Sequence, residues 1–270
     1  MHIKNCSLLF GLLALCLLLS TCISAPPALD LQQLETEIHA LTNRFREEQA
    51  LPPLAELPEL KRVSRIHSQD MAERQFFEHI NPDGKNPTDR LEEGFPEAVN
   101  RFSGENLAQH SQDRFNTEEL AAELLRLWIA SPEHHAQLIA PEYSHLGVGV
   151  VQDHAGIVYA TQTFATVVAQ LTTPLPAVLT SGTPFHLGFT FQGGLDPGEL
   201  SAFLETSDGF ARIEGPDGVF YQGKGPVPIL WEDNTRFQIK IPTELGPGQY
   251  SVRLGQGSRF FERRYTLTVQ

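Results

Sequence analysis

The chain has 270 residues and a formal net charge of -13 at pH 7. A negative charge of this size repels nucleic acid and anionic membrane surfaces, so neither is expected as a partner. The length exceeds that of one ordinary compact domain, and we expect two domains that each bury a hydrophobic core. With 41% hydrophobic residues, 19 prolines and 21 glycines, the composition indicates a globular, turn-rich protein rather than a disordered one.

Residues 1–24 are predicted to form an export signal peptide. A short basic stretch precedes the uncharged apolar run of residues 7–19, which is shorter than the roughly 20 residues that span a bilayer, and small residues follow it. Two processing routes fit this segment: cleavage near Ser24 or Ala25, or lipid attachment at Cys22. On either route the mature protein works outside the cytoplasm, secreted or in the cell envelope, with no transmembrane segment after the signal.

All three cysteines, Cys6, Cys16 and Cys22, lie within this segment. The mature chain therefore cannot form an internal disulfide, and its hydrophobic cores alone must stabilise it. Without thiols it has neither a cysteine nucleophile nor cysteine ligands for zinc.

Several stretches of the first half have the signals of amphipathic helices. Helices are expected at about residues 31–48, at about residues 59–75, and from the N-cap Asn116 onward. A further helix is expected to begin at Ser131, a capping residue that precedes Pro132 at the first helical position.

Two other segments of the first half are predicted as loop and sheet. Residues 81–104 are rich in Pro and Gly and are expected to form a long ordered loop, which in a compact domain is usually functional or packed on itself. Residues 145–153 and 156–165 are apolar and β-branched, and they are joined through the turn residues 153–156. We expect an antiparallel hairpin with one face buried.

The stretch from His67 to Gly84 carries the strongest functional signal. His67 lies on or beside the buried stripe of the second predicted helix, while His79 precedes the turn NPDG at residues 81–84, where the chain changes direction. Side chains at such junctions often line clefts. The alternative is that His67 is a packed, hydrogen-bonded core residue and His79 an ordinary loop residue.

From about Val167 onward the sequence changes to short β-prone runs separated by turns. Residues 172–176 (TTPLP) are expected to be a linker, and about eight strands follow it. This spacing predicts an all-β domain, an antiparallel β-sandwich of the immunoglobulin-like type. No catalytic grouping stands out there, because the acidic residues lie mostly in turns.

Seven blocks of the first half form an ordered series. They are HSQDM at 67–71, FFEHINPDG at 76–84, Asp89-Arg90, SGENLA at 103–108, LWIASPEHHAQLI at 127–139, HLGVGV at 145–150 and YATQTFA at 159–165. The series covers about residues 31–166 and resembles the bacterial branch of the CAP superfamily, whose SCP domains include the cysteine-rich secretory, antigen 5 and pathogenesis-related proteins. The resemblance implies an α-β-α sandwich around a central antiparallel sheet. The expected class is α+β, with a CAP domain at residues 25–170 and the β-sandwich at residues 171–270.

The resemblance also implies a surface cleft lined by two histidines and acidic residues. Carried onto this sequence, the first cleft histidine is His79, the first glutamate is Glu105 and the second histidine is His134. Eukaryotic relatives have a further glutamate where Ser131 stands here, and Glu133 is the nearest acidic residue. The remaining cleft-lining candidates are His67, Glu133 and His135, the last of which replaces the arginine usual after the second histidine.

Two chemical roles are open for this cleft. Two neutral imidazoles and a carboxylate can hold Zn²⁺ with a water in the open position, so His79, Glu105 and His134 are the predicted metal ligands and zinc the expected cofactor. The same side chains can instead form a hydrogen-bonded network that fixes loops relative to one another. The histidines lack the HExxH spacing, so no short motif by itself indicates a zinc site. No nucleophile elbow occurs and the mature chain has no cysteine, so serine and cysteine hydrolases are unsupported.

Three functions are consistent with these features. The first is a non-enzymatic exported binding protein whose cleft takes a divalent metal or small ligand and whose partner is a protein or a cell-wall component. The second is a metal-assisted hydrolase of peptide or cell-wall bonds, with Glu105 as ligand or general base. The third is a structural surface adhesin whose cleft only holds the fold together. The incomplete acidic set favours the first.

Overall fold

The computed structural model describes residues 28–111 and 115–270. The predicted export signal, with its three cysteines and the two processing sites, lies outside the described residues. Within the described residues, no helix has both the length and the apolar character needed to cross a membrane.

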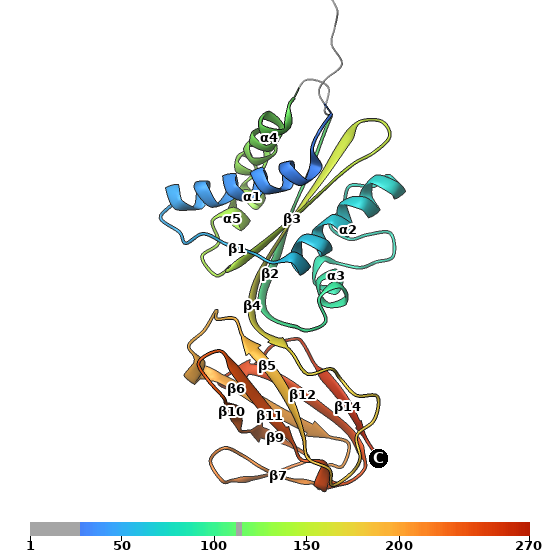
Figure 1. Ribbon diagram of the computed structural model, residues 1–270, viewed down its shortest axis with the longest axis vertical. Coiled ribbons are helices and arrows are strands. Elements are labelled where there is room, and N and C mark those ends of the chain that lie inside the picture. The colour runs from blue at the N-terminus through green and yellow to red at the C-terminus, as the bar shows by residue number, and fades with distance from the viewer. Residues whose placement is uncertain (1–27, 112–114) are drawn as a thin grey trace, which may run out of the picture.

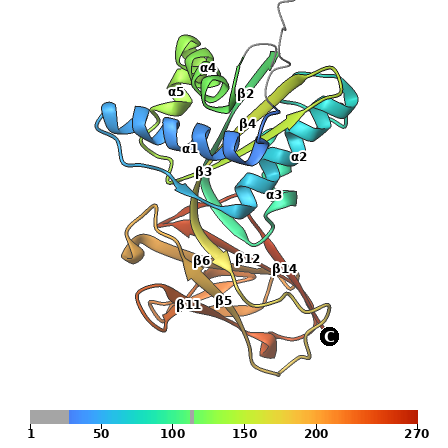
Figure 2. The ribbon, with the colours of Figure 1, turned by 45° about the horizontal axis from the view of Figure 1, so that its top comes forward.

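The first half folds into three layers around a central sheet (Figure 1). One face of the sheet is covered by α1 (Leu31–Glu48), α4 (Thr117–Ala130) and α5 (Pro132–Leu138), and the other by α2 (Pro58–Arg74) and α3 (Pro87–Gly94) (Figure 2). The strands are β1 (Ala55–Glu56), β2 (Ala98–Ser111), β3 (His145–Gln152) and β4 (Ile157–Leu171). Their order is β1-β3-β4-β2, with β1 parallel to β3 and the other pairs antiparallel. The expected mixture of helices and strands is confirmed.

The amphipathic helices lie where the sequence predicted them. α1 and α2 match the expected ranges to within one residue, and the Asn116 side chain caps α4 by accepting from the backbone N–H of Glu119. The cap of α5 differs from the prediction, because the Ser131 hydroxyl makes no capping hydrogen bond. Pro132 does occupy the first turn of that helix.

Two predictions for the first half are wrong. Residues 81–104 are not one long loop, since they contain α3 and the beginning of β2. A capping box specifies this helix: the side chains of Asn86 and Asp89 each accept from the other's backbone N–H, and Pro87 follows the cap. The hairpin of β3 and β4 is buried on both faces rather than one, because helices cover both sides of the sheet.

α2 lies very close to β3 because glycine alternates along that strand. A Cβ atom on Gly147 or Gly149 would meet the backbone of α2 at 2.2 Å and 2.0 Å. The hydroxyls of Ser64 and Ser68 lie 3.1 Å and 2.9 Å from the carbonyl oxygens of these two glycines. His67 belongs to the same helix, so this contact determines where its ring lies relative to the sheet.

The second half consists of strands and two short 3-10 helices, Pro197–Glu199 and Thr243–Leu245. Its strands are β5 (Phe185–Phe191), β6 (Leu200–Thr206), β7 (Arg212–Glu214), β8 (Phe220–Gln222), β9 (Lys224–Val227), β10 (Ile229–Trp231), β11 (Arg236–Ile241), β12 (Gly248–Gln256), β13 (Arg259–Phe260) and β14 (Tyr265–Val269). Each of the eight predicted β-prone runs overlaps at least one of them. The expected strand-rich second half is confirmed.

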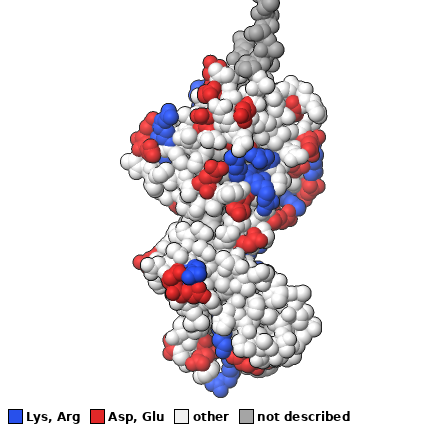
Figure 3. Space-filling model, viewed as in Figure 1, with Lys and Arg blue, Asp and Glu red and all other residues white. Residues whose placement is uncertain are grey.

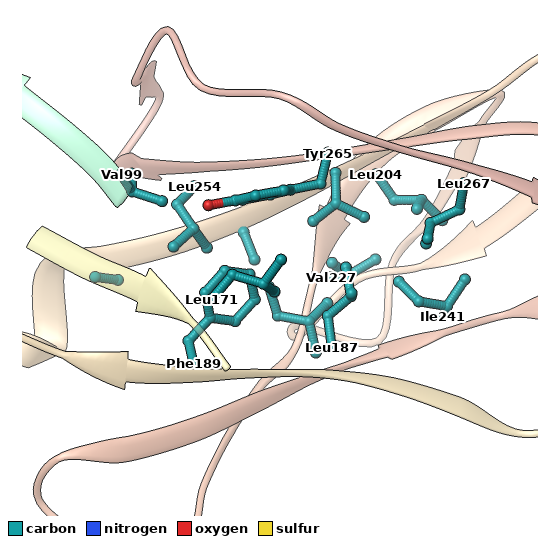
Figure 4. Close-up of a cluster of buried hydrophobic side chains, with 14 of the residues drawn as sticks. Val99, Leu171, Leu187, Phe189, Leu204, Val227, Ile241, Leu254, Tyr265 and Leu267 are labelled. Atoms are coloured by element: carbon teal, nitrogen blue, oxygen red, sulfur yellow. The ribbon is translucent and has the colours of Figure 1, made fainter. Parts of the chain in front are cut away.

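Two sheets enclose the hydrophobic core of the second half. One has the order β13-β12-β6-β9, with β14 also paired to β12, and the other contains β5, β11 and β10. Figure 4 shows side chains from both sheets meeting between them, among them Phe189 of β5 and Leu254 of β12.

β4 joins the two halves of the chain. Its residues Ala169–Leu171 pair with β5, so the sheet of the first half continues into the second. Val99 of β2 packs into the core of the second half (Figure 4). Arg263 reaches back and donates to the carbonyl oxygen of Glu92 in α3 at 2.7 Å. The two halves are therefore connected by pairing, packing and hydrogen bonding.

Candidate functional site at the edge of the sheet

β2 presents two polar side chains to opposite layers of the first half. Among the described strands β2 pairs only with β4, so its other edge carries no strand. Successive side chains of a strand point to opposite faces. Glu105 accordingly contacts the layer of α2 and α3, while Asn106 contacts α5. Each of these layers carries one of the two predicted cleft histidines.

The loop that carries His79 is anchored to α2 through Asn81. The Asn81 side chain is buried, and its amide nitrogen donates to Asp70 of α2 at 3.1 Å. Its side-chain oxygen accepts from two backbone N–H groups of the following turn, at 3.1 Å and 3.0 Å. These contacts confirm the turn predicted at residues 81–84 and hold the loop without regular secondary structure.

Arg90 connects three parts of the site. It lies in the first turn of α3 and is 8% exposed. Its Nη2 donates to Oε2 of Glu105 at 2.7 Å, and its Nη1 donates to the carbonyl oxygens of His79 and Lys85 at 2.7 Å and 2.9 Å. An unpaired buried carboxylate is strongly unfavourable, and this guanidinium gives the buried Glu105 side chain an ion-pair partner.

His79 is the exposed member of the site. Its Nδ1 lies 2.9 Å from Oε1 of Glu105, and its side chain is 48% exposed. An ionised carboxylate only accepts hydrogen bonds, so Nδ1 carries the hydrogen and donates it. In the neutral ring Nε2 is then left as the acceptor, available to a ligand.

His67 lies beneath this loop and is fully buried. Its Nε2 donates to the carbonyl oxygen of Glu78 at 3.2 Å and lies 3.9 Å from Oε1 of Glu105. The centroids of the His67 and Phe76 rings are 5.9 Å apart. Burial lowers the pKa of His67, and this effect exceeds the opposing influence of the Glu105 charge. His67 is thus a neutral, hydrogen-bonded core residue that supports the loop.

His134 approaches from the opposite layer. Its carbonyl oxygen accepts from Nδ2 of Asn106 at 3.1 Å, and the same nitrogen lies 3.2 Å from Oε1 of Gln162. Gln162 donates in turn to the hydroxyl of Thr42 in α1 at 2.8 Å. All three partners are fully buried. A network of uncharged groups therefore positions the backbone of the first turn of α5.

Gly104 lets the end of α5 approach β2. A Cβ atom there would meet the side-chain oxygens of Gln137 at 2.2 Å and Tyr143 at 2.3 Å. The Tyr143 hydroxyl donates to Gln137 at 2.5 Å, and burial raises the pKa of Tyr143 to about 12. In the GEN block Gly104 thus permits a close approach, Glu105 holds His79 and Asn106 holds His134.

The charge of His79 acts on the His134 ring. Burial lowers the pKa of His134, and the neighbouring His79 lowers it further, against a smaller upward influence of Glu133. His135 packs its ring against Phe45 of α1 at a centroid distance of 5.7 Å instead. Glu133 is exposed. Of the adjacent pair, His134 is therefore the one coupled to His79, and His135 is not.

The donors left for a metal ion are the two imidazoles. Both oxygens of Glu105 are directed at Arg90 and His79. Across residues 28–111 and 115–270, no three His, Cys, Asp or Glu side chains are grouped so that they could hold a metal ion. The residues that would hold an ion are therefore His79 and His134, and Glu105 stands behind His79, where carboxylates commonly orient a metal-bound imidazole.

Comparison with known proteins relates part of the chain to a family. Residues 39–167 match the model of the cysteine-rich secretory protein family, CAP. This stretch is a CAP domain. The chain is 29% identical over 133 residues to the uncharacterized protein YkwD of Bacillus subtilis, covering 49% of this chain and 48% of YkwD. It is 33% identical over 116 residues to the uncharacterized membrane protein YlbC of the same organism, covering 43% of this chain and 31% of YlbC.

Among solved structures, the chain is similar to an extracellular protein containing an SCP domain from Bacillus anthracis. The two are 30% identical in sequence, and the TM-score is 0.42. The match covers 50% of this chain and 40% of the other. The chain thus spans about half the length of YkwD and about a third of YlbC. The CAP domain covers the stretch in which the sequence analysis found its series of blocks.

Three polar residues that support the cleft were not among the predicted site residues. They are Arg90, Asn81 and Asn106. The capping box that begins at Asn86 would have revealed α3 and placed Arg90 in its first turn. No periodic signal identifies Asn81 or Asn106, because burial of a single amide becomes visible only when several layers meet around it.

Proposed function

We propose that this is an exported, non-enzymatic binding protein whose cleft receives a divalent metal ion, zinc, or a small ligand between His79 and His134. The observation that carries the proposal is the contact from Nδ1 of His79 to Glu105, which directs the free Nε2 away from its buried partner. The charge of His79 also acts on a second imidazole, that of His134 in the opposite layer. Two neutral imidazoles are soft enough for zinc and also serve as acceptors for a polar ligand.

The surroundings of Glu105 favour binding over hydrolysis. A general base must accept a proton from water or substrate. Both oxygens of Glu105 already accept hydrogen bonds from Arg90 and His79, and the side chain is only 3% exposed. A metal-assisted hydrolase of peptide or cell-wall bonds would need a more accessible carboxylate. The adhesin alternative assigns the same contacts a purely structural role.

We further propose that the protein acts in the cell envelope or outside the cell, held by lipid at Cys22 or released. The apolar run of residues 7–19 supports export. We propose an immunoglobulin-like β-sandwich for the second half, used to contact a protein or cell-wall partner. Figure 3 shows mixed acidic and basic groups over the CAP domain but a broad uncharged area over the second half, which suits a contact that does not depend on net charge.

Titration of Zn²⁺ into the purified chain from Ala25 to Gln270 tests the proposal. Measured by calorimetry, the binding is expected to be roughly stoichiometric and to be lost in the His79→Ala/His134→Ala double variant. The control variant His154→Ala, in the exposed turn between β3 and β4, should keep it. Glu105→Gln should weaken binding by about 10- to 100-fold, as loss of an orienting partner does. Binding that the double variant retains would contradict the proposal. Turnover of cell-wall peptides that Glu105→Gln abolishes would favour the hydrolase.

A further inference from the structure

The second half carries a pocket outside the CAP domain, on the face of the β12-β6-β9 sheet that points away from the core. Its volume is about 390 Å³, within the range of small-molecule sites. The pairing register puts Arg253, Phe203 and Pro226 in one row across the three strands. The pocket is therefore built on paired strands rather than on loops.

Aromatic rings form the walls of this pocket, and neighbouring contacts hold each of them. The rings of Phe203 and Phe260 meet edge to face, with centroids 4.2 Å apart. Tyr221 lies over Gly225, where a Cβ atom would come within 2.5 Å of it, and its hydroxyl donates to Asp217 at 3.2 Å. Rigid aromatic walls suit a flat apolar group, because such rings bury large areas with little loss of side-chain freedom.

Two cations lie beside these walls. Arg253 donates from Nε and Nη2 to the carbonyl oxygen of Phe261 at 3.2 Å and 2.9 Å, and its guanidinium lies 5.1 Å from the centroid of the Phe260 ring. These contacts fix its position. Its charge has no acidic partner among the described residues. Lys224 is exposed, and its side chain forms no ion pair or hydrogen bond within the described part of the chain. In a chain with a net charge of -13, two unpaired cations at one apolar pocket favour an anion.

The floor of the pocket contains a polar atom without a partner. Oγ of Ser251 is buried and makes no hydrogen bond to any described residue. Glu205 also lines the pocket, directly across the strands from Ser251 and Lys224. Its carboxylate lies 3.9 Å from Arg264, and the two cations Lys224 and Arg253 outnumber it in the lining. A buried hydroxyl that lacks a partner costs free energy, which an acceptor on a ligand would recover.

We infer that this pocket is a second binding site, for a small amphipathic anion that joins an apolar ring to a carboxylate or sulfonate group. The ring lies between Phe203, Phe260 and Tyr221. The acidic group faces Lys224 and Arg253 and accepts from the Ser251 hydroxyl. This inference is independent of the proposed role of the histidine cleft.

Fluorescence titration with 8-anilinonaphthalene-1-sulfonate tests this site, because the dye combines aromatic rings with one sulfonate. We expect saturable binding to the folded chain that weakens about tenfold in Lys224→Glu and also weakens in Ser251→Val. The uncharged dye N-phenyl-1-naphthylamine should bind more weakly than the sulfonate. Lys240→Glu, the same charge change on β11, is the matched control and should leave affinity unchanged.

Several results would overturn the inference. They are the absence of saturable binding, equal affinity for Lys224→Glu and the unaltered chain, a larger loss in Lys240→Glu, or equal affinity for the uncharged dye. A variant that fails to fold is recognised by its melting curve and by brighter, non-saturating dye fluorescence, the opposite of the expected loss. Lys224 is exposed and unpaired, so its variant is expected to fold.

Discussion

The two sides of the cleft hold their histidines by different physical means. On one side His79 depends on charge, because Glu105 and Arg90 form a buried ion pair around it. On the other side the backbone of His134 depends on the uncharged amides of Asn106 and Gln162. Charged groups lose more when a partner is removed, whereas neutral amides do not respond to pH. One histidine is thus held through a buried ion pair and the other through groups that carry no charge.

The largest effect is expected for Arg90→Met, which breaks the charged side. It leaves Glu105 buried without its cation, so the free energy of unfolding should fall by about 3–5 kcal/mol in urea denaturation. The double variant Arg90→Met/Glu105→Gln should recover a large part of this loss, because no unpaired charge remains. As a control, Arg126→Met removes an arginine from the exposed surface of α4 and should change stability by less than about 0.5 kcal/mol. Equal effects of Arg90→Met and Arg126→Met would refute the view that the charged side depends on this pair.

A smaller effect is expected for Asn106→Leu, which breaks the neutral side. The carbonyl oxygen of His134 and the side-chain oxygen of Gln162 lose their donor, at a cost of about 1–3 kcal/mol. Because no charge is involved, the loss should be the same at pH 5 and pH 8. A loss that changes with pH would show that the neutral network is coupled to the ionisable groups of the cleft.

The pH dependence of stability sharpens the same comparison through His67. Its folded-state pKa lies below the unfolded value of about 6.5, so the unfolded chain binds more protons in acid and the free energy of unfolding rises with pH. Stability should fall as pH drops below about 6.5, by up to about 1.4 kcal/mol per pH unit for each such proton. His39, His134 and His145, whose pKa values burial also lowers, add to this fall.

His67→Gln isolates the contribution of this one ring. The glutamine amide can still donate to the Glu78 carbonyl but does not titrate. The free energy of unfolding should therefore fall less steeply in acid, by the contribution of one proton. His154→Gln, in the exposed turn between β3 and β4, should leave the profile unchanged. An unaltered acid profile in His67→Gln would show that this ring is not the group that titrates.

Local patterns in the sequence determined most of the helices and strands. Helical spacing located α1 and α2, Asn116 marked the beginning of α4, and the β-prone runs of the second half became strands. These signals lie within a few residues of one another, so they can be read without knowledge of the fold. α3 also had such a signal, the capping box at Asn86, but the density of Pro and Gly around it suggested a loop.

Only the tertiary structure decided how the cleft is held together. The blocks placed His79, Glu105 and His134 as candidates, yet Arg90 and Asn106 became part of the site because α3, β2 and α5 meet there. The place of the adjacent His135 likewise depended on the tertiary structure, because its ring packs against Phe45 of α1. Hydrogen bonds and ion pairs between residues far apart in sequence leave no periodic trace, since their partners are set by packing rather than by local propensity.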